Sequence, residues 1–405
     1  MIKKIKIDHL KPGMYVSDLN NQWVPAGNKS RSGKIGSLAT IEKIRKLGIT
    51  EIYIDTNKGI DCAKGECLEI DPVKQLQAHQ FESLKTQSDA NHSPKRIPLE
   101  TSRDNAEKSY SQAKGLIGDI LEDIKNGKGI DAQAVDATTD DLIHSLNENE
   151  NALACLSFIR TKDEYLLEHS VNVGILLGIF CRARRIEPDV MRQVVAGGIL
   201  HDIGKILVPN EILNKPGKLS GAEWEEMKRH VTYGEQILDV TAGLSDITRS
   251  ICRQHHERLD GSGYPRNLPA KEITEFGRMS AICDVYDAVT ADRVYHTGMA
   301  PNDALRKLVE WSIFHLDKEL VYDFIRSLSV YPVGTLVELS NGRAGVVLEA
   351  NRRSPKHPVI KVFYNVRHEH HIEQEIVNLD DKKVSMEIIN TLDARALKID
   401  ISGIM

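Results

Sequence analysis

Residues 194–205 read VVAGGILHDIGK, an apolar run that ends on the adjacent pair His201 and Asp202, with Lys205 one helical turn further on. An apolar run that stops on polar residues is typical of a buried helix that reaches its end there. The sequence therefore indicates a helix end that carries an imidazole and a carboxylate side by side in the interior.

Further histidines and aspartates follow the same pattern on the neighbouring segments. His230 is expected on a helix that Ser220 opens, because Glu223 three residues later completes a capping-box pattern. The adjacent pair His255 and His256 ends a helix from about residue 245, just before the loop DGSGYP. The other members of the set are His169 and Asp284.

A single histidine on an apolar helix is more often a hydrogen-bonded core residue than a metal ligand. Five histidines and two aspartates on successive helices are different, because a helical bundle can bring such side chains to one interior point. Imidazole and carboxylate without cysteine favour iron or manganese, with zinc also open, and bridging carboxylates hold two such ions together. The set therefore predicts a two-metal centre suited to phosphodiester hydrolysis.

Lys205 lies on the same helical face as His201, and the sequence allows two roles for it. It either meets a substrate phosphate and assists proton transfer, or it caps a helix C-terminus before Pro209.

The remaining chain predicts a multidomain α+β protein, because 405 residues exceed one ordinary core. Alternating and helical patterns in residues 1–81 predict a small α+β module, and the polar residues 82–103 predict a linker. Helical periodicity dominates residues 104–330. Residues 331–405 predict a small β-rich appendage, with a hairpin around the dipeptide Asn341-Gly342.

Composition limits the possible partners and the compartment. A net charge of −5 and an isoelectric point near 6.3 argue against binding to long nucleic acids. The longest apolar stretch, residues 171–180, is well short of the roughly 20 residues of a membrane helix, and the amino terminus lacks a signal-peptide core. Six scattered cysteines suit a reducing compartment. We therefore expect a cytoplasmic protein without a membrane span.

Two of these stretches, HDIGK at 201–205 and HHERLDGSGYP at 255–265, resemble the two signatures of the HD-GYP family of HD phosphohydrolases. The resemblance covers roughly residues 151–328, which it implies to be the core of an all-α HD-type helical bundle. The first module also resembles the small domain that often precedes HD-GYP domains. In that family the matching metal ligands are His169, His201, Asp202, His230, His255, His256 and Asp284, with Asp202 as the bridging carboxylate.

The resemblance also implies the residues that bind substrate. Lys205 would lie near the attacking or leaving oxygen, Gly263, Tyr264 and Pro265 would shape the cyclic dinucleotide pocket, and Arg293 would grip a substrate phosphate. The family usually has a second basic residue three positions after that arginine, whereas this chain has His296.

Some members bind a third metal through a glutamate one turn before the first histidine ligand. This chain has Tyr165 at that position, and the flanking Glu164 and Glu168 are expected on a solvated helix face. Two metal ions are therefore favoured over three. Trp224 and Trp311 are expected to be packing residues, and Tyr264 is the better candidate for base stacking.

The leading hypothesis is a phosphodiesterase that hydrolyses cyclic di-GMP to linear pGpG, and in some members to GMP. One alternative is the same reaction on the hybrid cyclic GMP-AMP. Another is a catalytically silent receptor that binds a cyclic dinucleotide or a diguanylate cyclase, which the complete ligand set disfavours. A generic HD nucleotide phosphatase is disfavoured by the DGSGYP loop. A homodimer and a diguanylate cyclase partner both remain open.

Overall fold

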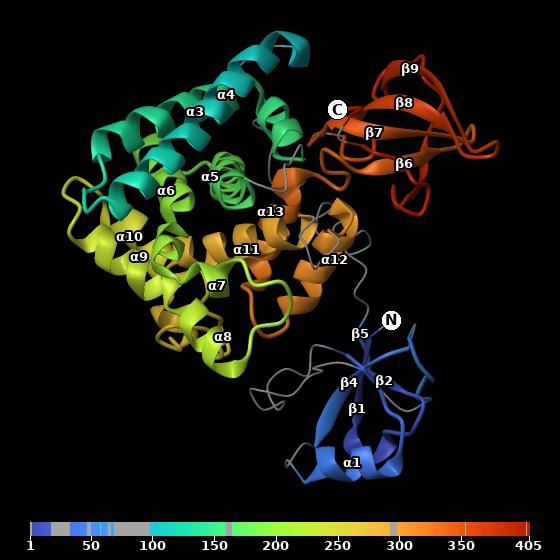
Figure 1. Cartoon of the computed structure of the whole chain (residues 1–405). Coiled ribbons are helices and arrows are strands. Elements are labelled where there is room, and N and C mark those ends of the chain that lie inside the picture. Colours follow the sequence, from blue (N-terminus) through green and yellow to red (C-terminus); the bar gives the residue numbers. More distant parts are fainter. Residues whose placement is uncertain are drawn as a thin grey trace.

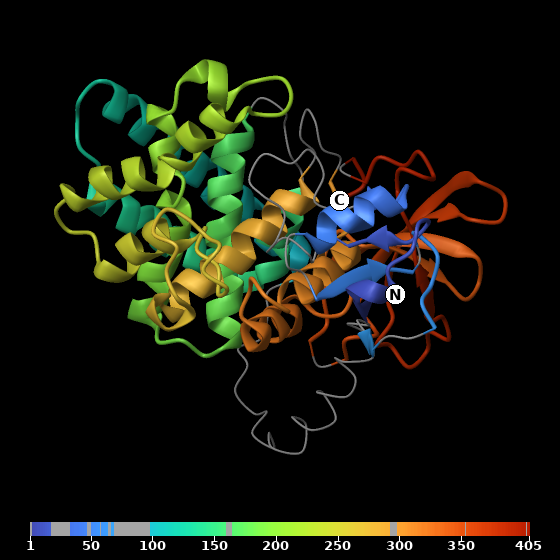
Figure 2. The same cartoon turned by 90° about the horizontal axis from the view of Figure 1, so that it is seen from below.

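The chain forms a helical body, and two small β-containing parts lie on one side of it (Figures 1 and 2). The structure is a computed structural model that describes residues 2–17, 33–46, 50–56, 58–63, 66–68, 98–158, 164–291, 298–352, 354–401 and 403–405. The expected multidomain α+β architecture, with an all-α bundle flanked by an α+β module and a β appendage, is confirmed.

The described residues of the first part form a five-stranded sheet, the α-helix α1 and the short 3-10 helix η1. Its elements are β1 (Ile2–Lys6), η1 (Ile7–His9), β2 (Tyr15–Val16), β3 (Gly33–Lys34), α1 (Leu38–Arg45), β4 (Glu51–Asp55) and β5 (Glu66–Leu68). The strand order is β3-β2-β4-β1-β5, and β1 pairs with β4 in an antiparallel register. Ser37 caps α1 by accepting a hydrogen bond from the Thr40 amide, and Ile41 and Ile44 on α1 are buried in this part's own core.

The helical body contains all the segments that carry the proposed ligands. Its elements are α3 (Leu99–Lys125), α4 (Ala132–Phe158), α5 (Tyr165–Ala183), α6 (Pro188–Leu200), η3 (Ile203–Leu207), α7 (Asn210–Leu213), α8 (Gly221–Lys228), α9 (His230–Asp239), α10 (Asp246–Gln254), η4 (Ala270–Glu272), α11 (Glu275–Thr290), α12 (Pro301–Trp311) and α13 (Lys318–Leu328). Helix α3 begins at Leu99, so the end of the segment expected as a linker is helical; residues 82–97 of that segment lie outside the described residues.

Helix α5 lies at the centre of the body, with other helices around it (Figure 1). Among the described helices, α5 alone is long and apolar enough to cross a membrane, and 78% of its apolar window is buried inside the body. A helix that is apolar on every face needs such surroundings. Its crossing with α6 is close, because a Cβ on Gly198 would lie 2.8 Å from the Cα of Gly174. This close approach brings together the two helices that carry His169 and His201.

The last part is an antiparallel five-stranded sheet. Its strands are β6 (Leu336–Leu339), β7 (Arg343–Glu349), β8 (Val359–Asn365), β9 (His370–Asn378) and β10 (Ile388–Thr391), in the order β10-β6-β7-β8-β9. The expected hairpin at Asn341-Gly342 is confirmed, because it joins β6 to β7. Gly342 has a φ of +77°, which a residue without a side chain adopts at little cost.

A buried ion pair fastens this sheet to the helical body. The Arg352 guanidinium, which follows β7, donates to the Glu150 carboxylate at 2.9 Å and to the Ser327 carbonyl at 2.8 Å. Arg182 on α5 also donates to Glu150, at 3.1 Å. Glu150 is only 5% exposed, so its charge depends on these two cations.

We predict that Arg352→Ala lowers the free energy of unfolding by about 1–2 kcal/mol, because it removes a charge-assisted hydrogen bond from a buried carboxylate. The matched control is Arg343→Ala, since Arg343 is exposed and lies 3.6 Å from the exposed Glu375. That pair should contribute less than about 0.5 kcal/mol. Chemical denaturation followed by circular dichroism measures both, and equal losses in the two variants would contradict the buried-pair account.

Candidate metal centre

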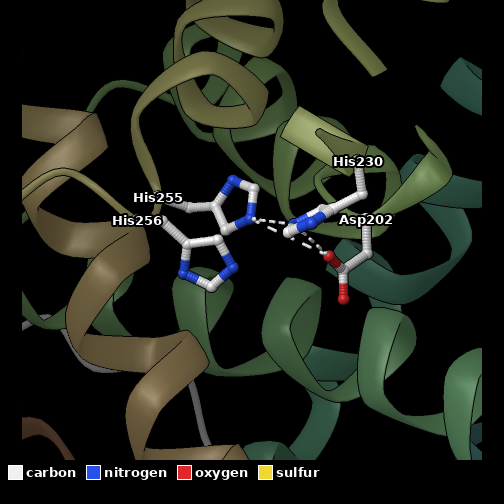
Figure 3. Close-up of side chains that lie close together, drawn as sticks. All are labelled: Asp202, His230, His255 and His256. Carbon is white, nitrogen blue, oxygen red and sulfur yellow. Dashed lines mark hydrogen bonds and ion pairs between the residues drawn. The ribbon is translucent and has the colours of Figure 1, made fainter. Parts of the chain in front are cut away.

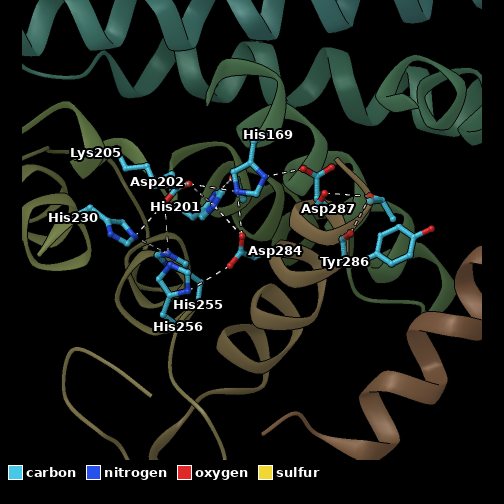
Figure 4. A network of polar contacts seen from close by, with 12 residues as sticks. His169, His201, Asp202, Lys205, His230, His255, His256, Asp284, Tyr286 and Asp287 are labelled. Carbon is cyan, nitrogen blue, oxygen red and sulfur yellow. Dashed lines mark hydrogen bonds and ion pairs between the residues drawn. The ribbon is translucent and has the colours of Figure 1, made fainter. Parts of the chain in front are cut away.

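Seven side chains from five segments converge inside the helical body (Figure 4). Their ligand atoms form two groups, and within each group the atoms lie within 4.8 Å of one another. The first group is Asp202, His230, His255 and His256, and the second is His169, His201 and Asp284. All are buried except His256, which is partly exposed. The structure therefore brings together every residue that the sequence analysis named as a ligand.

Three of the histidines are oriented by carbonyl groups at the ends of helices. His201 follows α6 and its Nδ1 lies 2.7 Å from the Gly198 carbonyl oxygen. His255 follows α10 and its Nδ1 lies 2.8 Å from the Cys252 carbonyl oxygen.

His230 repeats the arrangement, with Nδ1 2.7 Å from the Met227 carbonyl oxygen in the last turn of α8. The expectation that His230 lies on the helix opened by Ser220 is wrong in one respect. That helix, α8, ends at Lys228 after its capping box, and His230 begins α9. The chain tightens at this break, where the Arg229 amide donates to the Glu226 carbonyl three residues back. In all three rings Nδ1 donates a proton, which leaves the Nε2 lone pair for a metal ion.

His169 is oriented by a carboxylate instead. Its Nδ1 lies 2.8 Å from Asp287 on α11, so this carboxylate fixes the orientation of the ring. Its Nε2 faces Asp284 at 3.1 Å and Asp202 at 3.4 Å.

Each carboxylate in the centre faces both groups of ligands. Oδ2 of Asp202 lies 3.3 Å from His201 Nε2. Oδ1 lies 3.3 Å from His230 Nε2, and Figure 3 shows this contact. Asp284 is placed in the same way, with Oδ1 towards His169 and Oδ2 3.5 Å from His256 Nδ1. A carboxylate with one oxygen in each half has the geometry of a bridge between two ions. The sequence analysis named only Asp202 for this role.

Two buried atoms of the centre lack a hydrogen-bond partner among the described residues. They are Nε2 of His201 and Oδ1 of Asp202. Buried polar atoms are normally satisfied, and a lone pair left free in a cluster of imidazole and carboxylate groups is a ligand position. The donor set therefore fits divalent transition-metal ions.

The carboxylates of the centre are held ionised. Burial alone would raise the pKa of Asp202, but the Lys205 ammonium and the neighbouring imidazoles of His201 and His169 hold this pKa well below its usual range. The pKa of Asp284 is also lowered against the effect of burial, chiefly by its contact with His169. The Lys205 ammonium contacts Asp202 directly, and this carboxylate raises the pKa of Lys205 despite burial. Lys205 is therefore a cation at neutral pH.

The histidines differ in their protonation. Burial lowers the pKa of His230 to about 4 and that of His255 to about 3, so both rings are neutral at pH 7. Burial would also lower the pKa of His169, but Tyr165 and the three surrounding carboxylates raise it well above its ordinary value. In the metal-free protein His169 is therefore protonated at pH 7.

The glutamates beside Tyr165 do not share one environment. The expectation of a solvated face is wrong for Glu168, which is 2% exposed and lies 3.6 Å from the Lys114 ammonium. Glu164 is partly exposed and pairs with the same ammonium at 2.5 Å. Tyr165 itself stacks on His169, with ring centroids 5.6 Å apart.

The DGSGYP loop forms one edge of the centre. The Tyr264 ring lies 4.6 Å from the His256 ring, and its amide donates to the His256 carbonyl at 3.2 Å. Gly263 is buried against residue 257, where a Cβ would lie 2.5 Å from the Glu257 Cα, and the peptide from Tyr264 to Pro265 is cis. Arg293 and His296 lie outside the described residues.

The aromatic residues near the centre were only partly anticipated. Trp311 packs against the main core, as expected. Trp224 is 43% exposed, and its ring lies 6.0 Å from that of Tyr264. The expectation that Trp224 is a packing residue is therefore wrong. The sequence signal for its exposure is the stretch AEWEEMK at 222–228, where charged residues flank Trp224 on both sides.

Sequence comparison assigns each part of the chain to a known domain type. The HD domain matches residues 154–320, and the KOW domain associated with the HD domain matches residues 336–399. The domain of unknown function DUF3391 matches residues 2–135, so this match runs through the segment expected as a linker and into the helical body.

Several curated proteins match all or part of the chain. A cyclic di-GMP phosphodiesterase of Pseudomonas aeruginosa is 35% identical over 380 residues, which cover 94% of this chain and 89% of that protein. A cyclic di-GMP phosphodiesterase of Thermotoga maritima is 35% identical over 39% of this chain and 43% of its own length. A 3′3′-cGAMP-specific phosphodiesterase of Vibrio cholerae is 34% identical over 43% of this chain and 38% of its own length.

We predict that Asp202→Ala reduces bound metal to less than about one ion per chain, because a bridging carboxylate serves both ions. Elemental analysis of the anaerobically purified protein measures the content. Asp189→Ala is the matched control, since Asp189 lies on α6 with its side chain 89% exposed. Wild-type metal content in Asp202→Ala would contradict the bridge.

A second prediction follows from the raised pKa of His169. Metal binding at Nε2 must displace the proton that the ring carries at pH 7, so loading should release about one proton through this residue. Titration calorimetry with Mn²⁺ in buffers of different ionisation enthalpy measures the release. Asp287→Asn should reduce it, because the variant removes a carboxylate that raises the pKa of His169. An enthalpy independent of the buffer would show that His169 is neutral before loading.

Proposed function

Since the chain belongs to the HD-GYP family, we propose that it is a metal-dependent phosphodiesterase that hydrolyses cyclic di-GMP to linear pGpG, the product that some family members cleave further to GMP, in bacterial second-messenger signalling. The observation that carries the proposal is the complete set of seven ligands, with Asp202 and Asp284 each facing both halves of the centre. The Pseudomonas aeruginosa relative, matched over 94% of this chain, supports the same reaction.

Iron or manganese fits the ligands best. Three carboxylate and imidazole donors in one half and four in the other, without cysteine, suit these ions more than magnesium, which prefers oxygen ligands and retains water. Two such ions supply Lewis acidity to a phosphodiester and to the attacking water. We propose two ions rather than three, because Tyr165 stacks on His169 where some family members have a glutamate.

Lys205 acts as a cation or an acid in this proposal. Its pKa is raised and its ammonium contacts Asp202, so it does not accept a proton from water at neutral pH. The side chain is 19% exposed and lies beside the bridging carboxylate. From there it stabilises negative charge on the phosphoryl group or donates a proton to the leaving oxygen.

The substrate-binding groups are proposed from the loop and from the family pattern. Gly263 and Pro265 shape the loop that holds Tyr264 beside the ligand His256. Arg293 binds a phosphate of the cyclic dinucleotide, and His296 replaces the second cation of the family pattern. A neutral imidazole carries no charge, so it should bind the phosphate less tightly at pH 7 than a lysine or arginine at this position would.

Two alternatives to cyclic di-GMP hydrolysis are considered. The similarity to a 3′3′-cGAMP-specific phosphodiesterase favours cyclic GMP-AMP as the second candidate substrate. A silent receptor, or a partner of a diguanylate cyclase, would not need a complete ligand set, which speaks against that reading. We place the protein in the cytoplasm, in keeping with a helix α5 that is buried inside the body. A homodimer is compatible with this function and not required by it.

Anaerobic purification followed by product chromatography tests the proposal. Cyclic di-GMP and cyclic GMP-AMP are each offered to protein loaded with iron, manganese or magnesium. We predict pGpG from cyclic di-GMP with iron or manganese, and loss of activity in air for the iron form. Intact cyclic dinucleotides with every metal would refute the phosphodiesterase, and equal rates with magnesium alone would refute the metal assignment.

A further prediction concerns the phosphate clamp. His296→Lys should lower KM for cyclic di-GMP more at about pH 7.5 than at about pH 6, where the wild-type imidazole itself gains charge. Arg293→Ala should raise KM and leave bound metal unchanged, because Arg293 is assigned to the phosphate alone. Loss of metal in Arg293→Ala, or a pH-independent effect of His296→Lys, would show that the clamp is misplaced.

A further inference from the structure

Trp224 is a large aromatic side chain that is partly exposed to solvent near the candidate metal centre. It lies on α8, a surface helix without a buried residue, and 43% of it is exposed. Trp311 has a different environment, because it packs against the main core and under the Lys307 ammonium. An exposed indole offers a ligand a large apolar face, while its N–H can remain hydrated.

A row of rings connects Trp224 to the metal ligands. Trp224 meets Tyr264 at 6.0 Å with an interplanar angle of 80°, so the two rings are nearly perpendicular. Tyr264 in turn lies 4.6 Å from the His256 ring and 6.3 Å from the His230 ring. A phosphate held at the proposed ligands carries its nucleoside one ribose away, which is within reach of these rings.

The helix that carries Trp224 is held firmly. Ser220 and Glu223 form a reciprocal capping box at its start, and the Lys215 ammonium binds both carboxylate oxygens of Glu223 at 2.6 Å. At its end, Glu226 accepts a hydrogen bond from the Tyr233 hydroxyl at 2.7 Å. A platform that is already ordered loses little entropy when a ligand stacks on it.

Positive charge lies beside the same rings. The Lys228 ammonium is 5.9 Å from the centre of the Tyr264 ring, and the side chain is 25% exposed. The exposed Glu225 carboxylate pairs with this ammonium at 2.9 Å and offsets part of its charge, and Lys228 lies one helical turn after Trp224 on α8. An aromatic platform next to a cation suits a nucleotide, because the base stacks while the phosphate is attracted.

We propose that Trp224 is a specificity-determining residue on which a purine base of the substrate stacks, with Tyr264 as the perpendicular wall of the same subsite. The inference rests on the proposed function and deepens it, since it names the group that recognises the base. Stacking on an aromatic ring tolerates guanine and adenine alike. The subsite therefore accepts both cyclic di-GMP and cyclic GMP-AMP and discriminates against diesters without a base.

Replacement of the indole by an aliphatic side chain of similar polarity isolates stacking. Trp224→Leu should raise KM for cyclic di-GMP about tenfold, in line with the loss of one base-aromatic contact, while metal content and kcat stay unchanged. Trp224→Phe retains a ring and should restore KM to within about twofold of wild type. Trp311→Phe is the matched control and should leave KM unchanged.

Inhibition by small ligands separates base binding from phosphate binding. In Trp224→Leu the inhibition constant of GMP should rise about tenfold, whereas that of inorganic phosphate should not change. A merely structural role for Trp224 would move both constants, or would lower metal content. Equal inhibition constants for GMP in the wild type and Trp224→Leu would overturn the proposal.

Fluorescence gives a readout without turnover and does not depend on the folding of Trp224→Leu. A non-hydrolysable phosphorothioate analogue of cyclic di-GMP should quench wild-type tryptophan emission and should leave Trp224→Phe unquenched, although calorimetry still detects binding. Equal quenching in Trp224→Phe would contradict base stacking on Trp224 and would leave the proposed phosphodiesterase activity unaffected. A wild-type protein that neither binds nor hydrolyses cyclic dinucleotides would overturn the function as well.

Discussion

The centre depends on hydrogen bonds between imidazole Nδ1 atoms and carbonyl groups at helix ends. A helix leaves its last carbonyls without an intrahelical partner. In this chain His201, His230 and His255 each use the carbonyl three residues back, at 2.7–2.8 Å. The same contact satisfies the backbone and turns the ring so that Nε2 points inward. Three helix ends are thereby converted into three oriented ligands.

This constraint explains why the centre needs the whole bundle. Helix ends can meet only where the helices pack closely, and α5 and α6 achieve this at Gly174 and Gly198. His169 lacks a helix-end carbonyl and takes its orientation from Asp287 instead. Asp287 also lines a cavity that reaches Glu150 and Arg352, where the C-terminal sheet docks. The residue that orients His169 and the ion pair that attaches the C-terminal sheet therefore line the same cavity.

The sequence correctly predicted those parts of the fold that depend on a few adjacent residues. The hairpin at Asn341-Gly342, the capping box at Ser220 and the helix that ends on His255 follow from a few adjacent residues, and the structure has each of them. The convergence of the ligands was predicted from their number and from the family signatures. Local patterns did not reveal that the helix is interrupted between α8 and α9. The tight turn at Arg229 contains no glycine or proline, which are the residues that usually mark such an interruption in a sequence.

Features that depend on tertiary contacts were harder to predict. Glu168 reads as a surface glutamate, yet it is buried beside Lys114 from a helix about fifty residues earlier in the chain. Trp224 reads as a core residue, and its exposure depends on the surface position of α8. Asp284, the second carboxylate proposed as a bridge, could not be distinguished from a terminal ligand without knowing that its two oxygens face different histidines.

The central claim is that one set of seven side chains holds two ions bridged by carboxylates. Anomalous diffraction from anaerobically grown crystals loaded with manganese tests it directly. The account predicts two peaks about 3.5–4 Å apart, with one oxygen of Asp202 directed to each. A single peak, or two peaks that do not share Asp202, would contradict it.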